Sequence, residues 1–139
     1  MPSLFEEYSV SKNLTLKNRL AMLPMGNACM NPDGSISDRQ IDFYEERAKG
    51  GFGLLFPTAC VVNTDFEDNP PPCVLKNYPQ SVRIGLLADR MHMYGTKLCV
   101  QLSMGLGRVS SGSPIIPPHA PSKSRSYWFP DLETIPFTT

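Results

Sequence analysis

Three short segments of the sequence combine residue types that suit a flat organic ligand and contain no acid or base. They are residues 24–27 (Pro-Met-Gly-Asn), 58–60 (Thr-Ala-Cys) and 101–104 (Gln-Leu-Ser-Met). Backbone amides and the Gln101 carboxamide can hold a planar, partly apolar molecule, because a carboxamide donates and accepts hydrogen bonds in one plane. A hydrolytic centre is not expected there. Gln101 also has a simpler interpretation, in which it hydrogen-bonds only to neighbouring loop backbone.

The other chemistry-bearing residues form no pattern typical of a catalytic or metal site. Residues 50–53 (Gly-Gly-Phe-Gly) lead from a predicted helix into a predicted strand, whereas a nucleotide-binding glycine loop leads from a strand into a helix. No nucleophile–base pair can be assembled from the spacing, so no catalytic residue is assigned. The cysteines form no Cys-x-x-Cys pair, which predicts no metal site and favours reduced, buried thiols at all four positions: Cys29, Cys60, Cys73 and Cys99.

Composition places the chain among ordinary globular proteins. It has 139 residues, 41% of them hydrophobic, with 13 basic and 13 acidic side chains. A zero net charge gives no long-range attraction to phosphate backbones or anionic lipid, so neither nucleic acid nor membrane is an expected partner. There is no apolar run of the roughly 20 residues that a membrane span needs, and no signal-peptide pattern, so the expected location is the cytoplasm. The length is also too small for a complete (β/α)8 barrel of about 250 residues.

The segments that would position these residues alternate between strands and helices. Apolar runs predict strands at residues 14–16, 19–23, 52–56 and 97–102. A first helix is predicted to begin after Ser37, which forms a capping-box pattern with Gln40, and to end at the glycine pair 50–51. A second helix is predicted with Ser81 as its cap and Gly95 beyond its end. Strands that alternate with helices in this way favour an α/β fold with a parallel sheet.

Several segments carry a family resemblance in the right order along the chain. They are residues 16–19 (Leu-Lys-Asn-Arg), 22–25 (Met-Leu-Pro-Met), 44–51 (Tyr-Glu-Glu-Arg-Ala-Lys-Gly-Gly), 100–102 (Val-Gln-Leu), 107–108 (Gly-Arg) and 120–122 (Ala-Pro-Ser). Together they resemble the Old Yellow Enzyme family of FMN-dependent NAD(P)H:flavin oxidoreductases, and in particular its 2,4-dienoyl-CoA reductase-like branch. The resemblance implies the N-terminal part, about three βα units, of a (β/α)8 TIM barrel. Residues 4–6 and 14–16 would form its N-terminal β-hairpin, and residues 4–139 would end in the loop after strand three.

The resemblance also implies a cofactor site. Pro24, Met25 and Gly26 match the segment that wraps the isoalloxazine ring of FMN, Ala59 matches a small residue against the flavin, and Gln101 matches the glutamine at its pyrimidine edge. The family's reductant is NAD(P)H, and its substrates are small enone or enoyl compounds with an activated C=C bond. Two departures stand out at this site. Gly26 occupies a position where many relatives have Thr or Cys, and residues 103–104 (Ser-Met) replace a frequent Gly-His.

The family's remaining functional residues would follow later strands. Its substrate-binding His pair and its proton-donating Tyr follow strand four, and its FMN phosphate loops follow strands seven and eight. No catalytic residue is therefore assigned to this chain, and an iron–sulfur cluster or FAD would belong to the C-terminal part of the longer relatives. The 139 residues alone are expected to be inactive. The alternative is a non-catalytic barrel fragment that acts as a binding or assembly module, or as one piece of a split protein.

Overall fold

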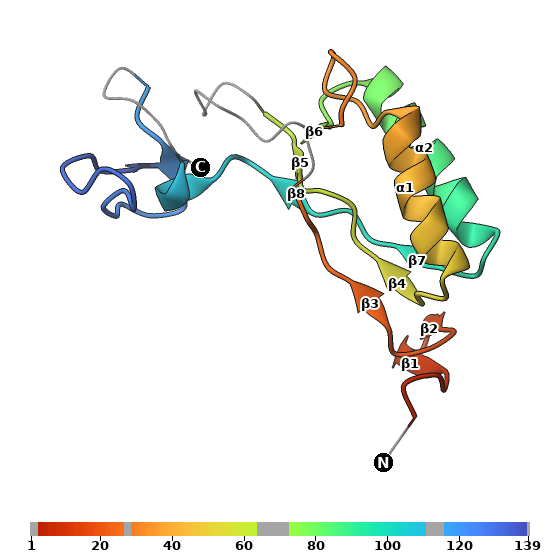
Figure 1. Cartoon of the computed structure of the whole chain (residues 1–139). Helices are drawn as coiled ribbons and strands as arrows, with labels where there is room; N and C mark the ends of the chain where they lie inside the picture. The colour runs from red at the N-terminus through yellow and green to blue at the C-terminus, as the bar shows by residue number, and fades with distance from the viewer. Residues whose placement is uncertain (1–2, 27–28, 64–72, 111–115, 139) are drawn as a thin grey trace.

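Two helices lie on one side of a set of short parallel strands (Figure 1). The computed structural model describes residues 3–26, 29–63, 73–110 and 116–138. Strands β3 (Ala21–Met22), β4 (Leu54–Leu55) and β7 (Lys97–Leu98) form a parallel sheet in the order β3-β4-β7. This arrangement confirms the predicted α/β class with parallel strands joined through helices.

Two of the predicted strands continue into a second parallel sheet. It consists of β6 (Cys73–Val74), β5 (Cys60–Val61) and β8 (Leu102–Ser103) in that spatial order. The backbone bonds Cys99 N–H to Leu55 O (3.0 Å) and Cys60 N–H to Gln101 O (2.8 Å) keep the second and third strands side by side between the two sheets. Pro57 has no N–H to donate to a ladder, which accounts for the interruption between β4 and β5.

The N-terminal hairpin differs from the expected one in its first strand. Antiparallel strands β1 (Tyr8–Ser11) and β2 (Leu14–Leu16) form it, so the prediction for residues 14–16 is confirmed. The prediction for residues 4–6 is wrong. Leu4 and Phe5 are 58% and 74% exposed and lie in a turn before β1. The alternation of residues 8–11 between Tyr, Ser, Val and Ser is the period-two signal that marks the actual strand.

Helix α1 (Asp38–Lys49) has the ends that the sequence predicts. The Ser37 hydroxyl accepts a hydrogen bond from the Gln40 backbone N–H (3.2 Å), as an N-cap should. Gly51 follows the helix at a φ of +102°, a left-handed conformation that favours glycine. A turn at residues 31–34 precedes the helix, with the Gly34 N–H donating to the Asn31 carbonyl (2.9 Å).

Helix α2 (Tyr78–His92) begins earlier than the sequence predicts. Its N-cap is Asn77, and the proposal that Ser81 caps it is wrong. The Asn77 side chain accepts from the Gln80 N–H (3.1 Å), and the Gln80 side chain accepts from the Asn77 N–H (3.2 Å), which completes a capping box. Pro79 lies in the first turn, where its missing N–H costs nothing. Ser81 is one turn inside the helix instead, and its hydroxyl donates to the Tyr78 carbonyl (2.7 Å).

The core lies between the helices and the strands. Its fully buried members come from α1, α2, β4, β5, β6 and the residue just ahead of the α1 cap: Ile36, Ile41, Tyr44, Ala48, Leu55, Cys60, Cys73, Leu87 and Met91. The predicted burial of all four cysteines is only half right. Cys60 and Cys73 are buried, whereas Cys29 is half-buried and Cys99 is exposed. In the part of the chain that the structure describes, neither helix is long and apolar enough to cross a membrane.

The remaining elements form an extension beyond β8. The 3-10 helix η1 (Gly107–Val109) is followed by β9 (His119–Ala120) and β10 (Ile135–Pro136), which pair in parallel. This extension lies away from the two helices (Figure 1). It carries three exposed aromatic residues, at positions 127–129, of which Trp128 donates its indole N–H to the Val109 carbonyl (2.9 Å).

A carboxylate network joins the two helices. Glu45 of α1 is only 7% exposed and accepts hydrogen bonds from the Tyr94 hydroxyl (2.9 Å) and the Arg90 guanidinium (2.6 Å). The Lys49 ammonium lies 3.2 Å from the same carboxylate. These contacts, the hydrogen bond from Tyr94 above all, hold the pKa of Glu45 below its usual value. The folded state therefore favours the ionised form.

This network predicts a pH-dependent difference between the wild type and Glu45→Gln. A carboxyl whose pKa is lowered by folding contributes stability above its unfolded pKa, about 4.3, and loses that contribution as the pH falls through its folded pKa. The variant should melt at a lower temperature than the wild type near neutral pH, and the difference should shrink as the pH falls below about 4. Thermal melts by circular dichroism measure it. Asp42→Asn, an exposed change on α1, is the control; a difference for Glu45→Gln that stays constant with pH would contradict this account.

Candidate functional site

The predicted site residues all lie at the carboxyl ends of neighbouring parallel strands. Residues 24–26 follow β3, which ends at Met22. Ala59 follows β4 and Gln101 follows β7, and each of them immediately precedes the short strand that comes next along the chain, β5 and β8 respectively. In parallel α/β folds this edge is where ligands bind. Asn27, the last residue of the first predicted segment, lies outside the described residues.

Backbone pairing brings Ala59 and Gln101 together. The Gln101 carbonyl accepts the N–H of Cys60, the residue after Ala59, at 2.8 Å, and the Ser103 carbonyl accepts the Val62 N–H at 2.9 Å. The small side chain and the carboxamide therefore belong to adjacent strands at the same level. Segment 24–26 follows β3, which lies on the other side of β4 from β7 in the first sheet.

The side chains at this edge are open to an incoming molecule. Gln101 is exposed, and its carboxamide makes no hydrogen bond to any of the described residues. The simpler interpretation of Gln101, that loop backbone satisfies it, has no support within the described part of the chain. Met25 is 63% exposed, and a Cβ added to Gly26 would meet nothing within 4 Å. Among Pro24, Met25, Gly26, Ala59 and Gln101 there is no charged group, so the edge offers hydrogen bonds and apolar surface without acid–base chemistry.

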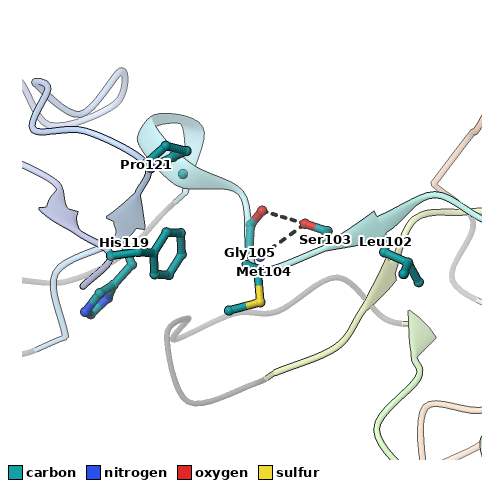
Figure 2. Close-up of a pocket in the computed structure, with 8 residues that line it drawn as sticks. Leu102, Ser103, Met104, Gly105, His119 and Pro121 are labelled. Carbon is teal, nitrogen blue, oxygen red and sulfur yellow. Dashed lines mark hydrogen bonds between the residues drawn. The ribbon is translucent and has the colours of Figure 1, made fainter. Parts of the chain in front are cut away.

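A cavity of about 400 Å³ lies directly beyond Gln101 on the same strand. Figure 2 shows it between the end of β8 and the extension that carries His119. It is lined by Leu102, Ser103, Met104, Gly105, Gly107, His119, Pro121 and Phe137. The Ser103 hydroxyl donates to the Gly105 carbonyl (2.6 Å) and accepts from the Gly105 N–H (3.1 Å), which fixes the backbone of residues 103–105 in the cavity lining.

Sequence reasoning did not find the role of His119 or Phe137 in this cavity. Their rings stack with centroids 5.8 Å apart, although 18 positions separate them in the sequence. The parallel pairing of β9 with β10 brings them together, with Ile135 opposite His119. Neither a motif nor a periodic pattern in the sequence indicates that β9 pairs with β10, so the cavity could not be predicted from the sequence.

Asn18 fixes how the first strand meets the second. Its side-chain amide donates to the Gly51 carbonyl (2.6 Å), and its side-chain carbonyl accepts the Leu20 N–H (3.0 Å). Gly53 lies against it so closely that an added Cβ would be 2.6 Å from the Asn18 Oδ1 and 2.8 Å from its backbone oxygen. Asn18 and Gly53 therefore hold β3 beside β4, and so set the position of residues 24–26.

Tyr44 positions the backbone just ahead of Ala59. It is fully buried on α1, and its hydroxyl accepts a hydrogen bond from the Thr58 N–H at 2.9 Å. The helical spacing of Ile41, Tyr44 and Ala48 marks Tyr44 as a residue of the apolar face of α1 and does not indicate the hydrogen bond of its hydroxyl. A signal was present, because a tyrosine at a fully buried position usually has a hydrogen-bond partner for its hydroxyl.

Removing that hydroxyl is expected to destabilise the fold. In Tyr44→Phe the Thr58 N–H, in a residue that is 2% exposed, loses its acceptor, and a buried unpaired donor costs about 1–3 kcal/mol. Urea unfolding should show a lower free energy of unfolding with an unchanged denaturant slope. Tyr78→Phe is the matched control, because Tyr78 is 80% exposed and its variant should stay within about 0.5 kcal/mol. Equal effects for the two variants would refute the role of Tyr44.

Curated relatives of the chain carry the names of oxidoreductases. The "Cinnamate reductase" of Clostridium sporogenes is 40% identical over 112 residues, which cover 77% of this chain and 17% of that protein. The "NADPH dehydrogenase" of Listeria monocytogenes is 34% identical over 131 residues, which cover 91% of this chain and 38% of that protein. The chain thus spans between about a sixth and two fifths of the length of these relatives.

Solved structures show the same fold. The Old Yellow Enzyme homologue from Zymomonas mobilis superposes with a TM-score of 0.72 at 25% identity and covers 89% of this chain and 34% of its own. A 2-naphthoyl-CoA reductase in complex with 2-naphthoyl-CoA gives 0.77 at 21% identity and covers 97% and 22%. These proteins are TIM barrels, so the parallel strands and helices of this chain are part of such a barrel, as the resemblance implied.

The sequence comparison extends over most of the chain. The family model described as the NADH:flavin oxidoreductase / NADH oxidase family matches residues 3–124. That range includes all the strand ends described above. The chain therefore belongs to the NADH:flavin oxidoreductase family, the family of the Old Yellow Enzymes.

Proposed function

We propose that this chain supplies the N-terminal part of an FMN-dependent NAD(P)H oxidoreductase of the ene-reductase type. Residues 4–139 would form the first portion of the FMN-binding barrel domain. The observation that carries the proposal is the exposed Gln101 carboxamide, without a partner among the described residues, on the strand adjacent to Ala59. The other barrel strands would supply the groups that contact the substrate and the FMN phosphate.

The residues present fit a flavin. The pyrimidine edge of an isoalloxazine ring presents both N–H and C=O groups, and a carboxamide such as that of Gln101 is complementary to both. Ala59 is small enough to let a flat ring approach the strand. Gly26 has no side chain, and the space around its Cα is open, so it does not block the same edge. Met25, 63% exposed, offers a soft apolar contact. None of these residues is charged, which suits a neutral ring system.

Each residue has a limited task in the proposed reaction. When bound, FMN supplies the transfer of hydride from NAD(P)H to the activated C=C bond of a substrate. Gln101 would fix the orientation of the ring through two hydrogen bonds, and Pro24, Met25 and Gly26 would hold it with backbone groups and apolar contact. Tyr44 would not contact the flavin; it would position Ala59 through its hydrogen bond with the neighbouring Thr58 N–H. No proton donor to the substrate is proposed within the described residues.

The cavity beyond Gln101 supports a small organic substrate. Leu102, Met104 and Phe137 give it an apolar lining, and His119 and Ser103 give it polar groups. A relative that is 40% identical is named for cinnamate, an unsaturated acid with an aromatic ring. We propose an enone or enoyl compound of similar size as the substrate, with its apolar end in this cavity.

The 139 residues alone are expected to bind FMN weakly and to show no NAD(P)H oxidation. Three barrel strands contact only one part of a flavin, and binding energy from the remaining strands would be missing. Purification followed by an absorbance spectrum and an NADH oxidation assay tests this expectation. A chain that retained stoichiometric flavin and oxidised NADH would overturn it and would make the chain a complete enzyme.

The function itself is tested in a completed barrel. In this chimera the 139 residues replace the matching N-terminal segment of the Listeria monocytogenes NADPH dehydrogenase, which they match over 131 residues. We expect it to oxidise NADPH with an enone acceptor under anaerobic conditions. A chimera that folds, as judged by its circular dichroism and cooperative melting, but has no such activity would contradict the proposal.

A further inference from the structure

Two buried cysteines lie directly opposite each other on paired strands. Cys60 of β5 is in register with Cys73 of β6, and their sulfur atoms are 2.9 Å apart. Their exposed fractions are 0% and 1%. A disulfide needs sulfur atoms about 2.05 Å apart. The two sulfur atoms therefore need to approach by less than 1 Å to form a covalent bond.

The backbone holds the pair in place from both sides. The Leu75 N–H donates to the Val61 carbonyl (2.8 Å), and the Val74 N–H donates to the Gly34 carbonyl (2.8 Å). On its other edge β5 pairs with β8, where Cys60 is opposite Leu102. Both cysteines also belong to the core cluster with Leu55 and Leu87. The two sulfur atoms are consequently fixed relative to each other before any reaction.

The environments of the two thiols differ in a way that distinguishes their roles. The hydrogen bond between the two thiols lowers the pKa of Cys60, although burial acts in the opposite direction. The same hydrogen bond, together with burial, raises the pKa of Cys73. Cys60 is thus the sulfur that ionises more readily. A thiol with a lowered pKa beside one with a raised pKa is the arrangement expected of a nucleophilic and a resolving cysteine.

We propose that Cys60 and Cys73 are a redox-active pair that forms an intrachain disulfide on reaction with a hydroperoxide. The Cys60 thiolate attacks one oxygen of hydrogen peroxide and the O–O bond breaks. Cys60 becomes a sulfenic acid, and the hydroxide released takes up the proton lost by Cys60 to give water. The Cys73 sulfur then attacks the Cys60 sulfur, the S–O bond breaks, and the departing hydroxide leaves with the Cys73 proton as a second water. Two thiols lose two electrons in all, and one peroxide gains them.

The pair is independent of the proposed flavin function, since the argument uses only the register, the burial and the surroundings of the two sulfurs. The proposal also predicts that the more exposed thiol is not the one that forms the disulfide. The exposed thiol of Cys99 is the more accessible one, yet it has no partner cysteine with which to form the paired geometry described here. Peroxide should therefore convert the two buried thiols to a disulfide, even though simple exposure would direct oxidation to Cys99.

The experiment uses the full chain with the substitutions Cys29→Ser and Cys99→Ser, which leave the buried pair untouched. The protein is treated with hydrogen peroxide, unfolded, alkylated with iodoacetamide and measured as an intact chain by mass spectrometry. We expect a monomer that is lighter by two hydrogens and carries no alkyl group. We also expect a melting temperature higher by about 5 °C, a rise that dithiothreitol abolishes.

Peptide mapping locates the bond. Trypsin leaves both cysteines in one peptide, residues 50–76, and a further cut after Glu67 separates them. The two halves should stay joined until they are reduced. Adding Cys60→Ser to the same background leaves one thiol and should abolish both the mass change and the rise in melting temperature. The proposal is overturned if both buried thiols remain alkylatable after peroxide treatment, or if the only disulfide joins two chains.

Discussion

Replacement of Leu87 by alanine is expected to lower the free energy of unfolding by about 2–5 kcal/mol. Leu87 is fully buried on α2, in the cluster that also contains Tyr44 of α1 and Leu55 of β4. Truncation removes the buried methyl groups and leaves a cavity that the surrounding helices and strands fill only in part. The site should suffer as well, because Tyr44 and Leu55 belong to the segments that position the strand ends.

A matched control lies one position away. Leu86 is 39% exposed on the same helix, so Leu86→Ala keeps the chemistry of the change and removes the burial. Its free energy of unfolding should stay within about 0.5 kcal/mol of the wild type. Urea titrations followed by circular dichroism measure both variants. Similar losses for Leu86→Ala and Leu87→Ala would show that α2 does not pack as the structure describes.

Replacement of Gln101 by leucine is expected to weaken FMN binding by about tenfold or more in the completed barrel. The leucine has a similar size but leaves the polar edge of the flavin without a partner, and an unpaired buried polar group costs about 1–3 kcal/mol. A loss of 1.4 kcal/mol corresponds to a tenfold change in Kd. Fluorescence titration of the flavin-free protein with FMN gives the two dissociation constants.

The control for Gln101→Leu is Lys97→Leu. Lys97 is also exposed and lies on the same barrel strand, but it is at the amino end, in β7, away from the proposed flavin edge. Its replacement should leave the Kd for FMN unchanged. If both variants bind FMN equally well, Gln101 does not contact the flavin, and if both lose affinity, the effect comes from the strand and not from the carboxamide.

Local signals predicted the helices well because caps are encoded within a few residues. Ser37 is followed by Gln40 and the cap forms where the sequence indicates. Ser81 fails by the same rule, since Asn77 and Gln80 form a complete capping box one turn earlier and Pro79 favours a first-turn position. Of the two candidate N-caps, Asn77 is the one observed, because Gln80 returns its hydrogen bond and Pro79 fits the first turn.

Non-local pairing explains most of what the sequence did not reveal. The pairings of β5 with β6 and of β9 with β10 join short segments whose two residues carry too little pattern to identify a strand. The contact of Cys60 with Cys73 and the cavity around His119 depend on those pairings. The strand-end positions of Pro24, Met25, Gly26, Ala59 and Gln101 could be predicted, because apolar runs mark the parallel strands that precede or contain them. Their role toward a flavin comes from the family resemblance and remains a proposal.

The most direct test of the account is the flavin content of the completed barrel. The chimera with the Listeria NADPH dehydrogenase should purify with close to one FMN per chain, measured from its visible absorbance after the protein concentration has been determined independently. The same chimera with Gln101→Leu should retain less FMN after dialysis. A chimera that folds cooperatively but contains no FMN would show that these strand ends do not form part of a flavin site.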